Sequence, residues 1–294
     1  MCGNILTETK EKNIKIGFLG GDMRTIELYK ICKENYKFVC TYGLEKCIEI
    51  ETKDKINNFL DFVSVVDIVI TAIPLSKDGK NINTIFSEQE LNIDNLIHSC
   101  KNKIVITGNI SDDLKNKLQE NNEVYDILKL EELAVLNSIP TAEGAIQIAM
   151  EKSTRTIHGS KCLILGFGRI GKILSKMLFG IGAEVFCEAR KESDIAWIKS
   201  YGYNSLKLEM LDSMLSNFDF IFNTIPYVIL NKANLKNVNK ECLIIDLASK
   251  PGGIDFEEAK NLELNVEWAL ALPGKVAPKT SAMYIFDIIN GILN

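Results

Sequence analysis

The strongest constraint on the fold is a glycine-rich turn in the second half of the chain. It follows the apolar strand expected at Lys161–Leu165, and Gly166, Gly168 and Gly171 have the spacing Gly-x-Gly-x-x-Gly. The first glycine permits a tight turn, the second lets the backbone approach a pyrophosphate, and the third lets the following helix pack closely on the strand. A helix N-terminus offers free N–H groups to phosphates. The motif predicts a dinucleotide site formed by Gly166, Phe167, Gly168, Arg169, Ile170 and Gly171.

The next strand bears on which dinucleotide is bound. NAD sites usually carry an acidic residue at the tip of this strand, where it contacts the ribose hydroxyls. We expect a strand at Val185–Ala189 with Ala189 at its tip. Because side chains alternate along a strand, Glu188 is expected to point away from the site. Ala189 followed by Arg190 and Lys191 suits a 2′-phosphate, so the sequence predicts NADP, with NAD as the alternative.

A short segment after a later strand is a candidate for the nicotinamide end of the same site. Thr224, Ile225 and Pro226 follow the apolar run at 218–223. The segment 71–74, Thr-Ala-Ile-Pro, ends a strand of the first half in a similar way. Both segments have the alternative interpretation of prolines that merely end a strand.

Strands and helices alternate through both halves of the chain. This alternation predicts an α/β fold with two Rossmann-like, doubly wound parallel-sheet domains and a cleft between them. The expected domains are residues 1–136 joined by a C-terminal helix at 274–294, a connector helix at 137–157 that Pro140 must break or kink, and a dinucleotide-binding domain at 158–273. The expected strands are 14–19, 38–42, 67–73, 104–107, 124–127, 161–165, 185–189, 218–223, 242–247 and 266–271, and the main helices are 23–35, 130–156, 170–181, 194–201 and 280–293.

Composition excludes several classes of function. The 294 residues are 46% hydrophobic and 25% charged, with a formal net charge of −5. The negative balance argues against a nucleic-acid partner, which needs a basic surface. No uncharged apolar run reaches the roughly 18 residues of a membrane helix, and Met1–Lys15 lacks the pattern of a signal peptide. We therefore expect a cytoplasmic protein that contacts neither membrane nor nucleic acid.

Metal-binding and histidine-dependent chemistry find little support. The eight cysteines show no Cys-x-x-Cys spacing, and there are two histidines. We therefore expect no metal site, and we expect Cys162, Cys187 and Cys242 to be buried reduced thiols. His98 and His158 lie away from the expected nicotinamide position, which disfavours a histidine-dependent hydroxyacid dehydrogenase.

Three segments are candidates for substrate binding at the carboxyl ends of the strands. The first, 17–24, is rich in glycine but lacks the full fingerprint, so a small anion at the helix N-terminus is expected there. The second, 137–145, and the third, 272–281, have the alternative interpretations of a helix N-terminal charge at Glu143 and a proline-rich hinge with solvated lysines. The candidate substrate-binding residues are Gly21, Asp22, Arg24, Asn137, Thr141, Lys275 and Ser281.

Five segments together resemble a known family. They are Gly20–Arg24, Asn137–Ala145, Gly166–Gly171, Ala248–Gly253, which reads Ala-Ser-Lys-Pro-Gly-Gly, and Leu272–Thr280, which reads Leu-Pro-Gly-Lys-Val-Ala-Pro-Lys-Thr. This combination is similar to the A subunit of dipicolinate synthase over nearly the whole chain, although Met23 stands where a polar residue would be expected.

The resemblance implies a reaction and a partner. Members of this family act with the flavoprotein-like B subunit of dipicolinate synthase and oxidise dihydrodipicolinate to dipicolinate in the mother cell of a sporulating bacterium. It further implies that an NADP bound to the second domain accepts a hydride and that a base accepts a proton. Glu143 and Lys250 are the candidate catalytic bases, and Arg24, Thr141, Lys275 and Ser281 are candidates to hold the two substrate carboxylates.

Two alternatives remain open from the sequence. One is another two-domain NAD(P)-dependent dehydrogenase, which the absence of a His-based acid–base pair disfavours. The other is a non-catalytic NAD(P)-binding regulatory subunit, because the chain carries no isolated catalytic dyad. A homo-oligomer is compatible with each of these interpretations.

Overall fold

The computed structural model describes residues 13–293 and divides into two compact units. Unit 1 comprises Met1–Ala134 and Ala277–Asn294, and unit 2 comprises Val135–Val276. The segment 137–157, expected as a connector between domains, thus belongs to unit 2. The predicted absence of a signal peptide concerns residues that lie mostly outside the described part of the chain.

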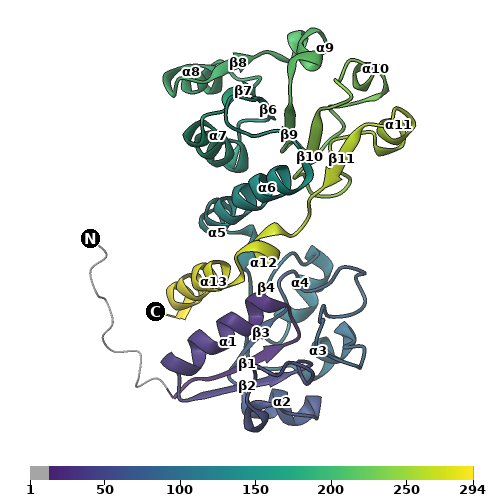
Figure 1. The fold of residues 1–294 in the computed structure, drawn as a ribbon. Coiled ribbons are helices and arrows are strands. Elements are labelled where there is room, and N and C mark those ends of the chain that lie inside the picture. Colours follow the sequence, from purple (N-terminus) through teal and green to yellow (C-terminus); the bar gives the residue numbers. More distant parts are fainter. Residues whose placement is uncertain (1–12, 294) are drawn as a thin grey trace. The chain divides into compact units, whose positions relative to one another are not determined.

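Unit 1 is a five-stranded parallel sheet with helices on both faces (Figure 1). The strand order is β2-β1-β3-β4-β5. Buried residues of α1 and α13 pack on one face of the sheet, and those of α2 and α3 pack on the other. The elements are β1 (Lys15–Leu19), α1 (Met23–Asn35), β2 (Phe38–Tyr42), α2 (Phe59–Val65), β3 (Ile68–Thr71), α3 (Ile93–Ser99), β4 (Ile104–Thr107), α4 (Asp112–Gln119), β5 (Glu123–Asp126) and α13 (Pro278–Leu293), with α5 (Glu131–Leu136) spanning the boundary.

Unit 2 is a six-stranded parallel sheet in the order β11-β10-β9-β6-β7-β8. From β6 the chain runs through α7 and α8 to the strands β7 and β8, and it then returns to β9 on the other side of β6. The helices before and after this reversal therefore cover opposite faces of the sheet. The elements are α6 (Ser138–Lys152), β6 (Lys161–Leu165), α7 (Arg169–Ile181), β7 (Glu184–Glu188), α8 (Glu192–Ser200), β8 (Asn204–Leu206), α9 (Leu211–Met214), β9 (Phe220–Asn223), α10 (Lys232–Leu235), β10 (Leu243–Asp246), α11 (Phe256–Asn261), β11 (Asn265–Trp268) and α12 (Leu272–Val276).

The central strands explain why both sheets are parallel. All residues of β3 are buried, as are all residues of β9 and β10. Strands that are apolar on both faces need helices on both sides, which is the arrangement of a parallel α/β sheet. The predicted fold of two such domains is therefore confirmed, while the cleft between them stays a prediction.

The predicted helix at 130–156 is two helices, α5 and α6. The break lies at Asn137, and Pro140 is the third residue of α6. Proline is tolerated in the first turn of a helix because its missing N–H has no partner there. The break predicted from Pro140 therefore falls three residues earlier than the proline itself.

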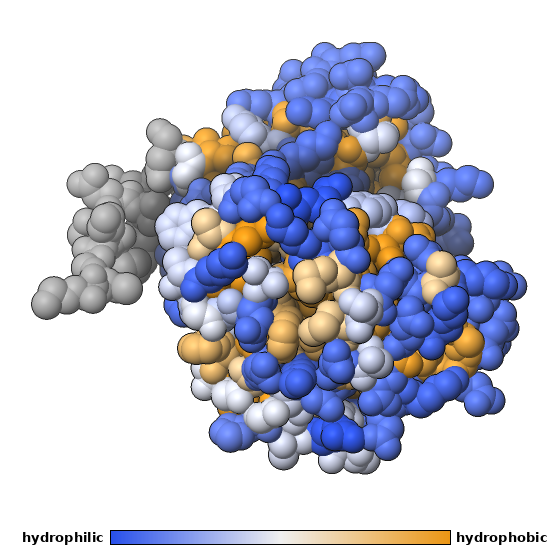
Figure 2. Space-filling model, turned by 90° about the horizontal axis from the view of Figure 1, so that it is seen from above, coloured by the Kyte–Doolittle hydropathy of each residue, from blue (hydrophilic) through white to orange (hydrophobic). Residues whose placement is uncertain are grey.

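The surface and the cysteines agree with the composition. Figure 2 shows hydrophilic residues over much of the face it draws, with apolar residues visible between them. Across residues 13–293 no helix is both long and apolar enough to cross a membrane. Cys162, Cys187 and Cys242 are buried free thiols, as predicted, and burial raises the pKa of Cys162 to about 12.

Candidate functional site in the second unit

The glycine turn between β6 and α7 has the geometry that its sequence predicts. Gly166 has φ +90°, and a Cβ there would lie 2.7 Å from the Thr224 hydroxyl. A Cβ on Gly171 would collide with the Gly166 carbonyl. A Cβ on Gly168 would meet nothing within 4 Å. Gly166 and Gly171 thus have no room for a side chain, whereas Gly168 leaves open space where a phosphate can approach.

The N-terminus of α7 lies directly at this open space. Its N-cap residue is Gly168, which has no side chain to bond the first N–H groups. The first N–H groups of a helix have no partner within the helix and carry the positive end of its dipole. The combination suits a bound pyrophosphate.

A cavity of about 520 Å³ surrounds the turn. It brings together most of the residues that the sequence assigned to the cofactor, from the ends of β6, β7 and β9. Asp194 and Tyr227 also line it and were missed, although Tyr227 directly follows the predicted Thr-Ile-Pro segment. The lining residues are Gly166, Phe167, Gly168, Glu188, Ala189, Arg190, Lys191, Asp194, Thr224, Ile225, Pro226 and Tyr227.

Glu188 lines this cavity, but its Oε1 atom is buried, so the expectation that the side chain points away from the site stays a prediction. The strand β7 ends at Glu188, one residue earlier than predicted, and both Glu188 and Ala189 line the cavity. The alternation of side chains holds only while the chain stays extended. Burial raises the pKa of the Glu188 carboxyl above its usual value, although a hydrogen bond from the Gly166 N–H and the charge of Arg190 oppose this.

The two cations that suggested NADP differ in their surroundings. The guanidinium of Arg190 lies over the ring of Tyr227, 5.7 Å from its centroid. Lys191 is exposed and is the N-cap residue of α8. Neither arrangement by itself requires a phosphate.

Hydrogen bonds hold the neighbouring strand ends in place. The Thr224 hydroxyl donates to the Leu165 carbonyl over 2.9 Å, which ties the end of β9 to the glycine turn. The Asn223 amide donates to the carboxylate of buried Asp246 over 2.8 Å, which links β9 to β10. The segment 224–226 is therefore fixed beside the cofactor turn.

The segment 248–253 is anchored in the same way at the end of β10. The Asp246 carboxylate accepts from the N–H groups of Ala248, at 3.0 Å, and Gly253, at 2.8 Å. The Trp268 indole donates to the Ala248 carbonyl over 3.0 Å. Lys250, a candidate base, is exposed on this anchored segment.

The first glycine turn, between β1 and α1, is covered by another segment of unit 1. The Gly21 N–H donates to the Asn83 carbonyl over 2.8 Å, and the Ile85 N–H donates to the Gly21 carbonyl over 3.3 Å. The segment 83–85 therefore covers the turn. A Cβ on Gly20 would lie 2.7 Å from the Asn83 carbonyl oxygen, and one on Gly21 would collide with Thr25.

Asp22 takes the position where an anion was expected. Its carboxylate accepts from the Arg24 N–H at 3.0 Å and caps α1. The same carboxylate forms an ion pair with the buried Arg24 guanidinium at 2.7 Å, and Arg24 also donates to the Ile73 carbonyl. The protein's own carboxylate thus caps this helix, and the small anion expected at its N-terminus stays a prediction.

The candidates on α6 have different environments. Glu143 is exposed, whereas the Thr141 hydroxyl donates to the Asn137 carbonyl over 2.7 Å. The Asn137 Oδ1 atom is buried without a hydrogen-bond partner among the described residues. Gly144 lets α6 approach Leu272 of α12 closely, because a Cβ there would be 3.1 Å from the leucine Cβ.

The remaining candidates are divided between the units. Lys275 is exposed at the end of α12 in unit 2, and Ser281 is buried in α13 of unit 1. Of the candidates already described, Glu143 and Lys250 belong to unit 2, and Asp22 and Arg24 to unit 1. Their roles with a substrate stay predictions.

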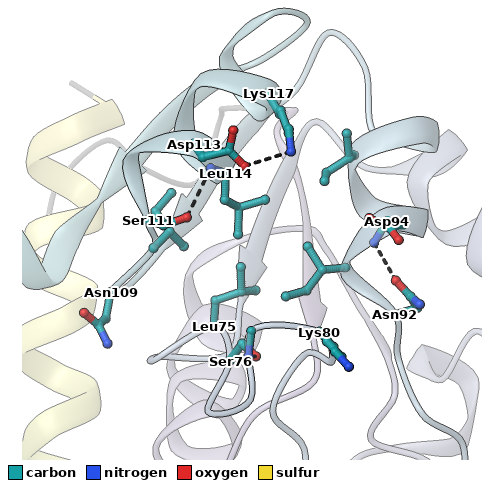
Figure 3. Close-up of a pocket in the computed structure, with 14 residues that line it drawn as sticks. Leu75, Ser76, Lys80, Asn92, Asp94, Asn109, Ser111, Asp113, Leu114 and Lys117 are labelled. Carbon is teal, nitrogen blue, oxygen red and sulfur yellow. Dashed lines mark hydrogen bonds and ion pairs between the residues drawn. The ribbon is translucent and has the colours of Figure 1, made fainter. Parts of the chain in front are cut away.

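Unit 1 also contains a cavity, of about 560 Å³, between α3 and α4 (Figure 3). The Ser111 hydroxyl caps α4, and the Asn92 amide oxygen accepts from the Asp94 N–H at 2.7 Å. Lys117 pairs with Asp113 at 2.8 Å. Each of these polar groups thus has a hydrogen-bond or ion-pair partner. The cavity lacks the free helix N-terminus found in unit 2, because side chains cap both α3 and α4.

The geometry of unit 2 defines a dehydrogenase-type domain that binds a nicotinamide dinucleotide. Residues 138–251 match the family model of the D-isomer specific 2-hydroxyacid dehydrogenase NAD-binding domain. Residues 15–128 match the model of the N-terminal domain of the dipicolinate synthase A subunit. The pair of matches covers both units.

The chain belongs to the family of dipicolinate synthase A subunits. It is 30% identical to the dipicolinate synthase A subunit of Bacillus subtilis over 95% of this chain and 96% of that protein. The crystal structure of the B. subtilis protein superposes with a TM-score of 0.85 at 28% identity, covering 98% of each chain. The crystal structure of the Bacillus halodurans A subunit also gives 0.85, at 26% identity, covering 97% of this chain and 99% of the other.

Proposed function

We propose that this chain oxidises dihydrodipicolinate to dipicolinate with a nicotinamide dinucleotide as hydride acceptor, acting with the B subunit of dipicolinate synthase in the mother cell of a sporulating bacterium. The observation that carries the proposal is the row of three strand ends in unit 2. The neighbouring strands β6, β9 and β10 end, in this order along the sheet, in the open glycine turn, the segment 224–226 and the segment 248–253. Family membership supports the choice of substrate and partner.

The reaction removes a hydride and a proton from a dihydropyridine ring and leaves an aromatic pyridine. When bound, the nicotinamide supplies the hydride acceptor. The chain must hold the substrate in line with it and accept the proton at a basic atom. Because aromatisation favours the product, positioning is the main demand on the protein.

Glu143 and Lys250 are the proposed proton acceptors. Both are exposed, and neither forms an ion pair within the described residues. Lys250 has the firmer support, because its segment is fixed by Asp246 and Trp268 at the end of β10. A rigid segment holds a base at a constant distance from its substrate.

The two substrate carboxylates need cations or hydroxyl donors. Lys275 suits this role because its ammonium is exposed and makes no ion pair with a described residue. Thr141 and Ser281 remain candidates as donors. Arg24 is less suited than the sequence implied, because Asp22 already neutralises its guanidinium.

The direct test is the absorbance of the reduced nicotinamide at about 340 nm with enzymatically generated dihydrodipicolinate. The purified chain is assayed with NAD and with NADP, with and without the partner B subunit. Turnover by the chain alone supports a complete dehydrogenase, and turnover only with the partner supports a site completed by the complex. No turnover in any mixture, with the cofactor still bound, contradicts the proposal and favours a regulatory role.

Variants separate the two candidate bases. Replacing the true base with Lys250→Met or Glu143→Gln should lower kcat by roughly 10²–10⁴-fold with little change in cofactor binding. Lys236→Met is the matched control for the lysine, since Lys236 is another exposed lysine of unit 2. Glu151→Gln is the control for the glutamate, since Glu151 is exposed on the same helix. Unchanged kcat in both test variants removes both residues as bases.

A further inference from the structure

A buried carboxylate at the end of β10 joins two segments that follow neighbouring strands. The Asp246 side chain is 0% exposed. Its Oδ1 atom accepts from the Asn223 amide at 2.8 Å and from the Ala248 N–H at 3.0 Å, and its Oδ2 atom accepts from the Gly253 N–H at 2.8 Å. An ionised carboxylate carries only acceptors, on two oxygens. It can therefore accept from all of these donors at once, whereas an amide at this position cannot.

Asn223 extends this hydrogen bonding to the segment 224–226, which lines the cofactor cavity. Its amide nitrogen also donates to the Ile225 carbonyl at 3.0 Å, and its amide oxygen accepts from the Ile225 N–H at 3.1 Å. The same segment is tied to the glycine turn by the hydroxyl of Thr224. The buried pair thus connects the cofactor turn to the segment 248–253.

Two glycines let the segment 248–253 lie directly on this pair. A Cβ on Gly253 would lie 2.0 Å from the Asn223 amide nitrogen, and one on Gly252 would lie 2.9 Å from Asp246 Oδ2. Gly252 also has φ +91°, which other residues rarely adopt. The two glycines of the Ala-Ser-Lys-Pro-Gly-Gly motif are therefore required by this contact, and the contact leaves the segment little room to shift.

We infer that Asp246 is a positioning residue of the proposed oxidation. Because its oxygens are buried and bonded, Asp246 neither contacts a substrate nor accepts a proton itself. Through Asn223 it holds the segment 224–226 at the cofactor cavity, and through backbone N–H groups it holds the segment that carries Lys250. It thereby sets the separation between the cofactor cavity and the proposed proton acceptor. The inference rests on the proposed function, since it requires the reaction to take place between these two segments.

The test compares Asp246→Asn with the wild-type chain in the turnover assay with the B subunit. The amide nitrogen of the variant faces an N–H donor, so the segment 248–253 should shift. A displacement of about 1 Å can lower a rate by roughly 10²-fold, and we expect a fall of this size in kcat per folded chain. The dissociation constants of NADH and NADPH, measured by nicotinamide fluorescence, should change far less, because the glycine turn is untouched. An unchanged kcat, or an equal loss of cofactor affinity, overturns the inference.

Trp268→Phe is a milder variant that leaves the buried pair intact. The Trp268 indole donates to the Ala248 carbonyl over 3.0 Å, and a phenylalanine keeps the ring contact with Phe256. Loss of this one hydrogen bond should lower kcat by roughly 3- to 10-fold. This variant decides the question if Asp246→Asn does not fold, and an unchanged kcat then overturns the inference.

Asp126→Asn in unit 1 is the matched control. Asp126 is 7% exposed at the end of β5, and its carboxylate likewise accepts from backbone N–H groups, those of Asn109 at 2.9 Å and Ile110 at 3.2 Å. The control should lose stability in thermal unfolding and keep its kcat. An equal loss of kcat in the control would assign the effect to general destabilisation and overturn the inference. No turnover by the wild type in any mixture overturns the proposed function and this inference together, whereas wild-type turnover that Asp246→Asn and Trp268→Phe both retain overturns this inference alone.

Discussion

The two glycine turns of this chain show how the same strand–turn–helix arrangement can be open or closed. In unit 1, residues 83–85 cover the turn at Gly20 and Gly21, and Asp22 caps the helix. In unit 2, the turn at Gly168 is uncovered and the helix has no side-chain cap. A Rossmann-like fold therefore does not itself create a dinucleotide site. The free N-terminus of the helix is what distinguishes the unit that binds.

The largest effect is expected from filling the open turn. Gly168 has φ −82°, which any residue adopts, and a side chain would meet nothing within 4 Å. Gly168→Asp should leave the free energy of unfolding unchanged or raise it by about 0.5–1 kcal/mol, because Asp is a good N-cap. Its carboxylate should repel the pyrophosphate and weaken binding of the nicotinamide dinucleotide, measured with both NADH and NADPH, by more than about 100-fold. Gly168→Ala is the matched control and should bind the dinucleotide more tightly than Gly168→Asp does.

A loss of stability without a loss of dinucleotide binding is expected from filling the closed turn between β1 and α1. Gly21 has φ +129°, and a Cβ would collide with Thr25. Gly21→Ala should lower the free energy of unfolding by about 2 kcal/mol, measured by urea denaturation. The affinity of the folded variant for NADH and for NADPH should be unchanged, since residues 83–85 and Asp22 cover this turn. A weakened dinucleotide affinity of the fully folded variant would contradict the comparison between the turns.

A smaller effect tests the ion pair in the closed turn. Asp22→Asn keeps a good N-cap and removes the charge that pairs with Arg24. We expect a loss of about 1–2 kcal/mol in the free energy of unfolding, because the guanidinium stays buried without its counter-charge. The same substitution at the exposed pair of Lys117 and Asp113, Asp113→Asn, should cost less than about 0.5 kcal/mol. Equal losses of unfolding free energy in the two variants would show that the Asp22–Arg24 ion pair stabilises the fold no more than an exposed pair does.

The smallest expected effect concerns the pH dependence of stability at Glu188. Because its folded pKa is raised above the usual value, the folded state binds more protons than the unfolded state just above pH 4.5. Stability is therefore lost as pH rises through the folded pKa. Glu188→Gln should be as stable as the wild type below about pH 4.5 and more stable than the wild type above the folded pKa. Unfolding curves across this range measure the difference, and a variant less stable at neutral pH would contradict the raised pKa.

The sequence predicted the regular elements well because apolar runs and glycines determine them locally. The helix Met23–Asn35 and the strand Lys161–Leu165 have the predicted bounds, and Gly182 ends α7 with φ +93°. The short strand β8 was missed because Asn204–Leu206 contains no apolar run.

The site was harder to predict because it depends on where single side chains point. The strand β7 ends one residue earlier than predicted, and no pattern in the sequence fixes that boundary. The closure of the first turn by Asn83, more than 60 residues along the chain, is a tertiary contact that local motifs do not encode. The substrate is proposed from the family resemblance alone, because neither the motif nor the cavity specifies it.

The most direct test of the open and closed turns is a calorimetric titration of the chain with NADH and with NADPH, repeated with Gly168→Asp and Gly21→Ala. We expect one binding site per wild-type chain for the dinucleotide, whose affinity Gly168→Asp lowers by more than about 100-fold and Gly21→Ala preserves. Two sites per chain, or binding that survives Gly168→Asp and disappears with Gly21→Ala in the folded protein, would contradict this expectation.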